Sequence, residues 1–113
     1  MEAKNFRVGN YYLDREKVWK IQSPQEIAMA CKGKPVPLTD KLLERLGLTC
    51  ISASVTHKRL FKIKDLKVRY PLRNFPLSVS YKGVPIAEVE YVHELQNLFF
   101  AITGTELELK ADV

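Results

Sequence analysis

The sequence predicts an α+β fold: a curved, mostly antiparallel β-sheet packed with two helices, at about residues 39–47 and 91–103. Two stretches repeat apolar residues at spacings of three and four, the period of a helix that buries one face. Most of the remaining chain consists of short strand-like runs. Because an amphipathic helix is not stable alone in water, these runs are interpreted as the sheet that covers the helices.

The clearest helix is predicted for residues 91–103. Gly104 stands where a left-handed cap would end it. His93 falls on the polar side of this helix, and Gln96 and Asn97 continue the polar strip, where they are expected to cover backbone polar groups. The apolar stripe is Val92, Leu95, Leu98, Phe99 and Ile102.

The second predicted helix covers residues 39–47. Thr39 has the side chain of a good N-cap, and Gly47 can cap the other end. The expected buried residues are Leu42, Leu43 and Leu46.

Strands are expected in the rest of the chain. Phe6–Leu13 and Val18–Ile21 predict a hairpin of the kind that opens small SH3-like barrels. Residues 25–30 are interpreted as a third strand or short irregular piece, because they are few and lie between a proline and a Lys-Gly-Lys-Pro run. Further strands are expected over residues 49–57, over 60–70 with a bulge or turn at 64–65, over 75–89 as a hairpin, and over 106–109.

The length of 113 residues predicts a single domain, 1–113. A hydrophobic fraction of 46% and a charged fraction of 27% are typical of a soluble globular protein. No run approaches the roughly 18 apolar residues of a membrane helix, and the N-terminus has no signal-type stretch, so a cytoplasmic protein is expected. Cys31 and Cys50 lack the spacing of a metal or redox motif and are expected to be partly buried thiols.

The positive charge is concentrated in residues 58–73. This segment holds seven basic residues and one acidic residue, so its charge of +6 exceeds the +5 of the whole chain. Lysine and arginine side chains attract phosphate groups, and an adjacent Tyr70, Trp19 or Tyr12 could stack on a base. The expected ligand-binding residues are Arg59, Lys62, Lys64, Lys67, Arg69, Tyr70 and Arg73.

Two structural alternatives compete with this binding site. The segment could be a solvated edge strand whose lysines prevent aggregation. Alternatively, Glu106 and Glu108 of the acidic C-terminal region could neutralise it within the molecule or across a dimer. The strand-like spacing places Lys62 and Lys64 on one face of the first strand, and Lys67 and Arg69 on one face of the second.

Catalytic signatures are missing from the sequence. It contains no P-loop, no dinucleotide-binding glycine motif, no nucleophile elbow and no zinc-protease motif. The only histidines, His57 and His93, are interpreted as surface or structural residues. A non-enzymatic protein without cofactor or metal is therefore expected.

Both ends of the chain resemble a known group of proteins. The run from Val92 to Leu107, VHELQNLFFAITGTEL, is similar to the C-terminal signature of small phage and prophage proteins of gut bacteria. Arg7-Val-Gly-Asn10 and Pro35-Val-Pro-Leu-Thr39 match two further motifs of that group. The resemblance covers roughly half of the chain. It implies a phage or mobile-element setting, and hence the host cytoplasm, but no chemistry.

The expected function is that of a phage or prophage binding protein that sequesters an anionic ligand, such as a host nucleotide immune signal, and so helps evade host defence. A protein-docking inhibitor or accessory protein that binds an acidic host protein is the first alternative. The second is a nucleic-acid-binding module, whose affinity would fall steeply with salt. A homo-oligomer is compatible with each, and a membrane partner with none.

Overall fold

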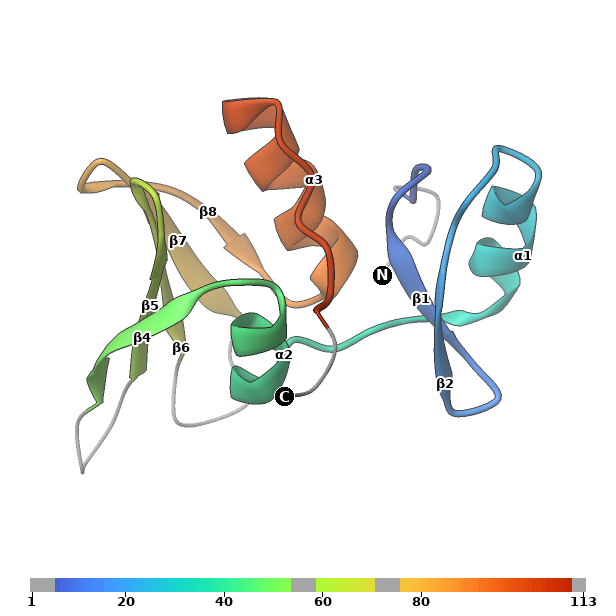
Figure 1. The fold of residues 1–113 in the computed structure, drawn as a ribbon, viewed down its shortest axis with the longest axis horizontal. Helices are drawn as coiled ribbons and strands as arrows, with labels where there is room; N and C mark the ends of the chain where they lie inside the picture. The colour runs from blue at the N-terminus through green and yellow to red at the C-terminus, as the bar shows by residue number, and fades with distance from the viewer. Residues whose placement is uncertain (1–5, 54–58, 71–75, 111–113) are drawn as a thin grey trace. The chain divides into compact units, whose positions relative to one another are not determined.

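The computed structural model describes residues 6–53, 59–70 and 76–110. These residues form three helices and eight strands, which confirms the α+β class. They fall into two compact units, and each is described by itself (Figure 1). Unit 1 comprises the chain up to Leu38 together with Tyr91–Glu106, and unit 2 comprises Thr39–Glu90 with the residues from Leu107 onward. Each unit has its own antiparallel sheet, and neither sheet closes into a barrel within the described residues. That the chain unfolds as one domain stays a prediction.

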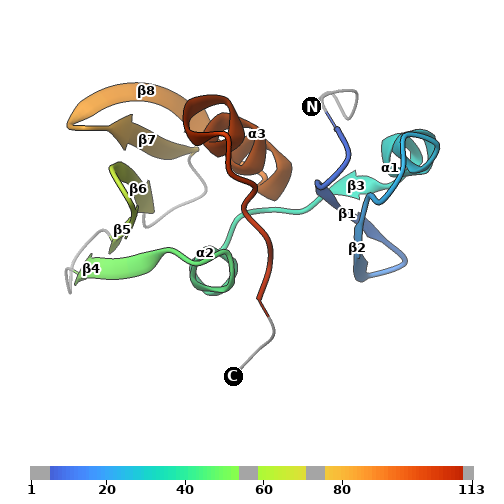
Figure 2. The same ribbon diagram turned by 45° about the horizontal axis from the view of Figure 1, so that its top comes forward.

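The sheet of unit 1 has three strands: β1 (Tyr11–Asp14), β2 (Lys17–Lys20) and β3 (Lys34–Pro35), in the order β2-β1-β3. Figure 2 shows β3 beside β1. The predicted N-terminal hairpin is confirmed as β1–β2. Its turn residues, Arg15 and Glu16, both have positive φ, of 53° and 64°, which suits the twist of a tight hairpin.

Residues 25–30 are not a strand, because helix α1 (Glu26–Lys32) occupies this segment. Glu26 lies in the first turn of this helix, and its carboxylate accepts a hydrogen bond from the backbone N–H of Gln22, in the preceding segment, at 2.7 Å. Ala30 is fully buried in a cluster with Phe6, Tyr12 and Ile21, so packing against the hairpin stabilises a helix too short to persist alone.

Helix α3 (Val92–Thr103) confirms the main sequence prediction. The carboxylate of Glu94 accepts a hydrogen bond from the backbone N–H of Tyr91 at 3.1 Å, and Gly104 ends the helix at φ 74°. The buried side of the helix is displaced from the predicted stripe: Leu98 and Ile102 are only half-buried, while two polar residues are buried. The fully buried side chains are Val92, His93, Leu95, Gln96 and Phe99.

The sheet of unit 2 has five strands that follow one another along the chain. They are paired in the order β4-β5-β6-β7-β8, so each strand is antiparallel to the next strand along the chain. Figure 2 shows the strands placed along an arc, which agrees with the predicted curvature. Bulges interrupt the pairing of β4 with β5 and of β7 with β8. The strands are β4 (Thr49–Ala53), β5 (Arg59–Ile63), β6 (Leu66–Tyr70), β7 (Leu77–Tyr81) and β8 (Val84–Val89).

The two faces of this sheet differ in composition. Residues of one parity are apolar, and the register places Phe61, Val68 and Val79 in one row across three strands. All three are at most 1% exposed. The other parity carries lysine, arginine and serine side chains. Alternation along each strand therefore produces one core face and one polar face.

Helix α2 (Asp40–Arg45) leads into β4. Thr39 is its N-cap as predicted, with its hydroxyl accepting from the backbone N–H of Leu42 at 3.2 Å. At the other end, Gly47 has φ 103°, and the backbone N–H groups of Gly47 and Leu48 bond to the carbonyls of Glu44 and Leu43. This is the Schellman arrangement, which satisfies two otherwise unpaired helix carbonyls.

The predicted strand at 106–109 is wrong, since these residues have no regular secondary structure. Leu107 is buried in unit 2, and the backbone N–H of Lys110 donates to the carbonyl of Arg45 at 2.7 Å. The segment is thus fastened by one buried side chain and by a hydrogen bond to the last residue of α2.

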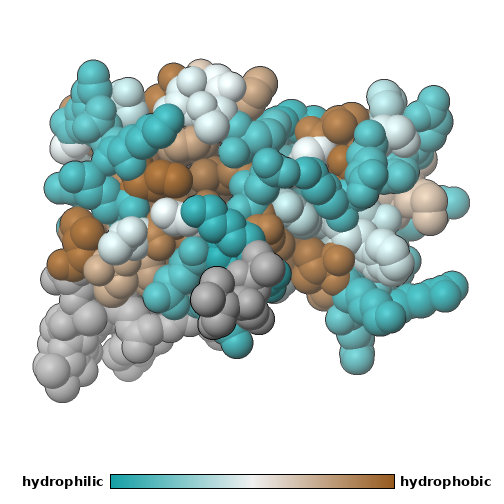
Figure 3. Space-filling model, in the orientation of Figure 1, coloured by the Kyte–Doolittle hydropathy of each residue, from teal (hydrophilic) through white to brown (hydrophobic). Residues whose placement is uncertain are grey.

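Apolar side chains reach the surface in both units, and Figure 3 shows such residues among hydrophilic ones. Cys31 and Cys50 are exposed, so the expectation of partly buried thiols is wrong. None of the helices built by the described residues is long and apolar enough to cross a membrane. The exposed large apolar residues include Trp19 and Met29 in unit 1, and Ile51, Val84 and Ile86 in unit 2.

Candidate functional site

The polar face of the unit 2 sheet gathers three of the predicted binding residues. Lys62 on β5 and Lys67 on β6 are direct partners in the antiparallel register. Arg69 lies two residues further along β6 and is partnered by Leu60. Because residues of one parity project from the same face, the three cationic side chains form one group. We call Lys62, Lys67 and Arg69 the cationic cluster.

An open hollow of about 420 Å³ lies beside this cluster. Its floor includes Ser78 and Ser80 of β7, which the register places opposite Arg69 and Lys67. No acidic side chain lines it within the described residues. Glu88 lies at the position opposite Ser78 on β8, outside the lining. The hollow is lined by Lys67, Arg69, Ser78, Ser80, Leu60 and Pro85, among others, and is called the basic hollow.

Two predicted site residues lie elsewhere. Lys64 has φ 52° and belongs to the β5–β6 turn, so the expectation that it shares a strand face with Lys62 is wrong. Tyr70 is half-buried and has the parity of Val68, so it lies on the opposite face from Lys67 and Arg69. Lys64 and Asp65 form a two-residue turn that makes Ile63 and Leu66 direct partners. The core-facing residues therefore have odd numbers on β5 and even numbers on β6.

The other two aromatic candidates, Tyr12 and Trp19, belong to unit 1, whereas the residues that line the basic hollow belong to unit 2. Tyr12 is 6% exposed and belongs to the core of unit 1, where it cannot offer a ring face to a ligand. Trp19 is half-exposed on β2 in unit 1. Of the flanking arginines, Arg59 takes the register position opposite Tyr70, and Arg73 lies outside the described residues.

Sequence reasoning missed the serines and the proline of the basic hollow. The run Leu77-Ser-Val-Ser-Tyr81 alternates apolar and small polar residues, a signal that places Ser78 and Ser80 on the polar face of this strand. It did not reveal that this face adjoins Lys67 and Arg69, because cross-strand partners depend on register. Pro85 lies on β8, an edge strand of the sheet, and its pairing with Ser80 follows the register shift between Val79 and Ser80.

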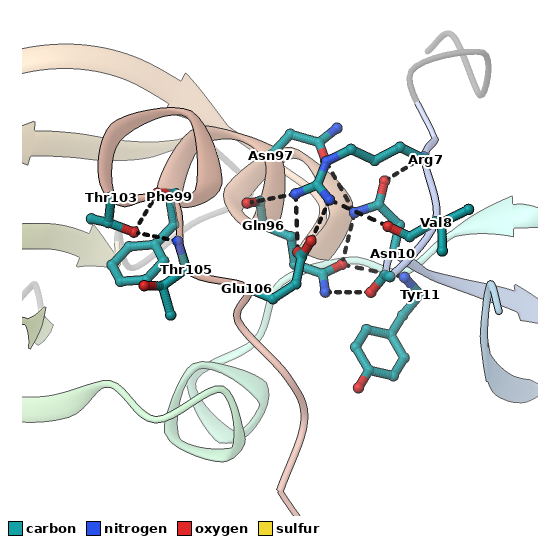
Figure 4. A network of polar contacts seen from close by, with 11 residues as sticks. Arg7, Val8, Asn10, Tyr11, Gln96, Asn97, Phe99, Thr103, Thr105 and Glu106 are labelled. Carbon is teal, nitrogen blue, oxygen red and sulfur yellow. Dashed lines mark hydrogen bonds and ion pairs between the residues drawn. The ribbon is translucent and has the colours of Figure 1, made fainter. Parts of the chain in front are cut away.

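A second polar constellation lies within unit 1 and is centred on Arg7 (Figure 4). Its guanidinium forms a two-pronged ion pair with Glu106, with Nη2 3.0 Å from Oε1. The same group lies 4.5 Å from the ring centre of Phe100 and donates to the carbonyl of Gln96 at 3.3 Å. Glu106 is thus engaged by Arg7 within unit 1. That Glu106 and Glu108 neutralise the basic segment of residues 58–73 stays a prediction.

Asn10 and Gln96 continue this constellation into the interior, and both are fully buried. The Gln96 amide donates to the carbonyl of Gly9 at 2.9 Å and accepts from the backbone N–H of Tyr11 at 3.2 Å. Asn10 donates to the side chains of Gln96 and Asn97 at 3.3 and 3.0 Å. Gln96 covers backbone polar groups as predicted, so these contacts join α3 to β1 and are structural.

His93 is fully buried, so its assignment to the polar side of α3 is wrong. Its ring lies 4.3 Å from that of Phe6 and 6.1 Å from that of Tyr91. Neither ring nitrogen has a hydrogen-bond partner among the described residues. Burial lowers the pKa of His93 below the ordinary 6.5, and the neighbouring Glu94 carboxylate offsets part of this effect. His57 lies outside the described residues.

Comparison with known proteins adds no relative to this picture. No protein-family model, curated protein or solved structure matches the chain. Within the described ranges, no group of three or more histidine, cysteine or acidic side chains could hold a metal ion. The basic hollow is therefore assessed on its own chemistry.

Proposed function

We propose that this chain is a non-enzymatic binding protein, and that the basic hollow takes a small ligand carrying phosphate groups. The observation that supports the proposal is that Lys67 and Arg69 line one hollow together with two serine hydroxyls. Arginine can grip a phosphate with two parallel hydrogen bonds, lysine supplies a mobile positive charge, and hydroxyls donate to remaining oxygens.

The pairing of two positively charged side chains across neighbouring strands also supports an anionic ligand. Lys62 and Lys67 are direct cross-strand partners, and like charges at such positions destabilise a sheet. Arg69 adds a third positive charge on the same face. A bound anion would remove this repulsion. Sites that weaken the empty fold in this way are commonly functional.

The resemblance to phage and prophage proteins suggests the setting of this activity. A small protein without catalytic motifs can act on a host by holding a host anion or signal out of circulation. We therefore propose sequestration of an anionic host ligand in the host cytoplasm. An acidic protein surface and a nucleic acid are the competing partners, and the following experiment includes an arm for the nucleic acid.

The experiment measures the melting temperature against inorganic tripolyphosphate at low ionic strength. A ligand that binds only the folded state raises the melting temperature, by an amount that grows with its concentration. We expect such a rise for the parent chain. The double variant Lys67→Gln/Arg69→Gln should lose most of it, whereas the control Lys17→Gln/Lys34→Gln, which removes two exposed lysines of unit 1, should keep it.

Two outcomes would overturn the proposal. The first is a parent chain with no tripolyphosphate response at low salt. The second is a folded Lys67→Gln/Arg69→Gln variant that responds like the parent. Binding of long duplex DNA with a steep salt dependence, in the absence of a tripolyphosphate response, would favour the nucleic-acid alternative.

A further inference from the structure

The basic hollow is larger and less polar than an inorganic anion requires. Its volume of about 420 Å³ lies within the range of small-molecule sites. Alongside the two cationic residues it is lined by Leu60 and Pro85, two residues without polar side-chain atoms. A phosphate group alone would leave this apolar surface uncovered, so the lining fits a ligand with a charged part and a second, less polar part.

The two kinds of lining lie on different strands. Lys67 and Arg69 belong to β6, and Pro85 belongs to β8. Between them runs β7, which presents the short side chains of Ser78 and Ser80. The hollow thus has two cationic residues on β6 next to the apolar Leu60 of β5, a hydroxyl-bearing floor on β7 and a second apolar residue, Pro85, on β8. A ligand can place its charged part over β6 and its less polar part toward Pro85.

The serine hydroxyls on the floor distinguish between two chemical classes for the less polar part of the ligand. Each hydroxyl can donate one hydrogen bond and accept others, and it loses water when a ligand covers it. An acyl chain offers no partner to Ser78 or Ser80. A nucleobase or ribose offers ring nitrogens, carbonyls or hydroxyls, together with a flat face for Pro85. The floor therefore favours a nucleoside over a lipid.

From this lining we infer that the ligand is a nucleoside phosphate. Its phosphates meet Lys67 and Arg69, with Lys62 beside them, and its nucleoside lies over β7 against Pro85. A diphosphate or longer chain matches the three positive charges of the cationic cluster better than one phosphate does. The inference rests on the proposed function and names the ligand class of the same site.

Calorimetric titration separates the two parts of the ligand. The probes are the four common nucleoside diphosphates, inorganic diphosphate and free adenosine, all at low ionic strength. We expect at least one nucleoside diphosphate to bind about tenfold more tightly than inorganic diphosphate, since modest apolar burial and one or two hydrogen bonds supply a factor of this size. Adenosine should bind far more weakly than the diphosphates.

A variant that fills part of the basic hollow tests where the nucleoside binds. Ser80→Ile places a larger, strand-favouring side chain on the floor, so the sheet is retained while the seat of the base is occupied. Its affinity for nucleoside diphosphates should fall to about that for inorganic diphosphate, which should itself change less than about twofold. Thr49→Ile, an exposed polar-to-isoleucine change on β4 outside the lining, is the matched control and should bind like the parent.

Pro85→Thr provides a second variant at an exposed position and should reduce nucleoside diphosphate binding selectively. Equal affinity of the parent for inorganic and nucleoside diphosphates would overturn the inference and leave the anion site intact. Unchanged nucleoside diphosphate affinity in both Ser80→Ile and Pro85→Thr would also overturn it. Absence of binding by every phosphate probe would instead refute the proposed function.

Discussion

Unit 1 and unit 2 are organised in different ways. In unit 1, β1 is joined to α3 by contacts such as that between Tyr11 and Gln96, which are 85 residues apart in the chain. In unit 2, each of the five strands pairs with the next one along the chain. All the buried polar residues of the described chain, Asn10, His93 and Gln96, belong to unit 1.

This difference shows two ways of specifying a fold. Unit 2 depends on alternation and on antiparallel pairing between strands that are neighbours in the sequence, so its contacts are local. Unit 1 depends on a buried amide network that is favourable only when all its members are satisfied. Mutations should therefore act differently in the two units, and the following predictions test this from the largest effect to the smallest.

The largest effect is expected from removing matched core phenylalanines. Phe99 of unit 1 and Phe61 of unit 2 are each 1% exposed. Phe99→Ala and Phe61→Ala should each cost about 3–5 kcal/mol in the free energy of unfolding. Trp19, the single tryptophan, reports on unit 1 by fluorescence during urea unfolding, and amide exchange in β5–β7 reports on unit 2.

Equal shifts of both signals in both variants would show a single cooperative domain, as the chain length predicts. Selective shifts would show two units that unfold separately. A loss below about 1 kcal/mol in either variant would contradict the burial of that ring.

Removal of the Gln96 amide should also be costly. Gln96→Leu keeps the size of the side chain but removes the amide group that bonds to the Gly9 carbonyl and the Tyr11 N–H. We expect a loss of about 2–4 kcal/mol, because each unsatisfied buried group costs about 1–3 kcal/mol. Asn97→Ala, at a half-buried neighbouring position, should cost less in the same urea titration. A neutral Gln96→Leu variant would show that the network does not stabilise unit 1.

His93 should make stability depend on pH. Its folded pKa lies below 6.5, so above that pH the ring is neutral in both states and contributes no pH dependence. As the pH falls below 6.5, the unfolded chain gains a proton that the folded chain resists. Unfolding free energy should then drop by up to about 1.4 kcal/mol per pH unit until the folded pKa is reached.

His93→Leu should remove this component, since it replaces a buried ring without hydrogen-bond partners by an apolar side chain. Urea titrations from pH 7.5 to 5 should show the parent and variant curves diverging only below about pH 6.5. His57→Gln, which alters the other histidine, is the control. Parallel curves for the parent and His93→Leu would contradict the burial of the ring.

The smallest effect concerns the N-cap of α2 in unit 2. Thr39→Ala removes the hydroxyl that accepts from Leu42 and should cost about 1 kcal/mol. Thr39→Asp should be nearly neutral, because aspartate caps equally well. Thr49→Ala, at an exposed position of β4, is a control for the loss of a threonine elsewhere. If Thr39→Ala melts like the parent, the cap does not stabilise the helix.

Local signals in the sequence sufficed for much of the fold. The spacing of Val92, Leu95 and Phe99 predicted α3, and Thr39 predicted the start of α2, because both signals lie within one or two helical turns. Alternation of apolar residues predicted the hairpin formed by β7 and β8. The same alternation predicted that Lys67 and Arg69 share a face. These features depend on neighbours a few residues away.

The sequence by itself thus determined the α+β class, two of the helices, the hairpins and the position of the positive charge. Tertiary structure alone decided what depends on distant partners. It made residues 26–32 a helix by burying Ala30, turned His93 and Gln96 inward, and moved Lys64 into a turn. It also brought Ser78 and Ser80 beside Arg69 and Lys67. The physical reason is that burial and strand register are set by contacts between segments far apart in the chain, which local periodicity does not encode.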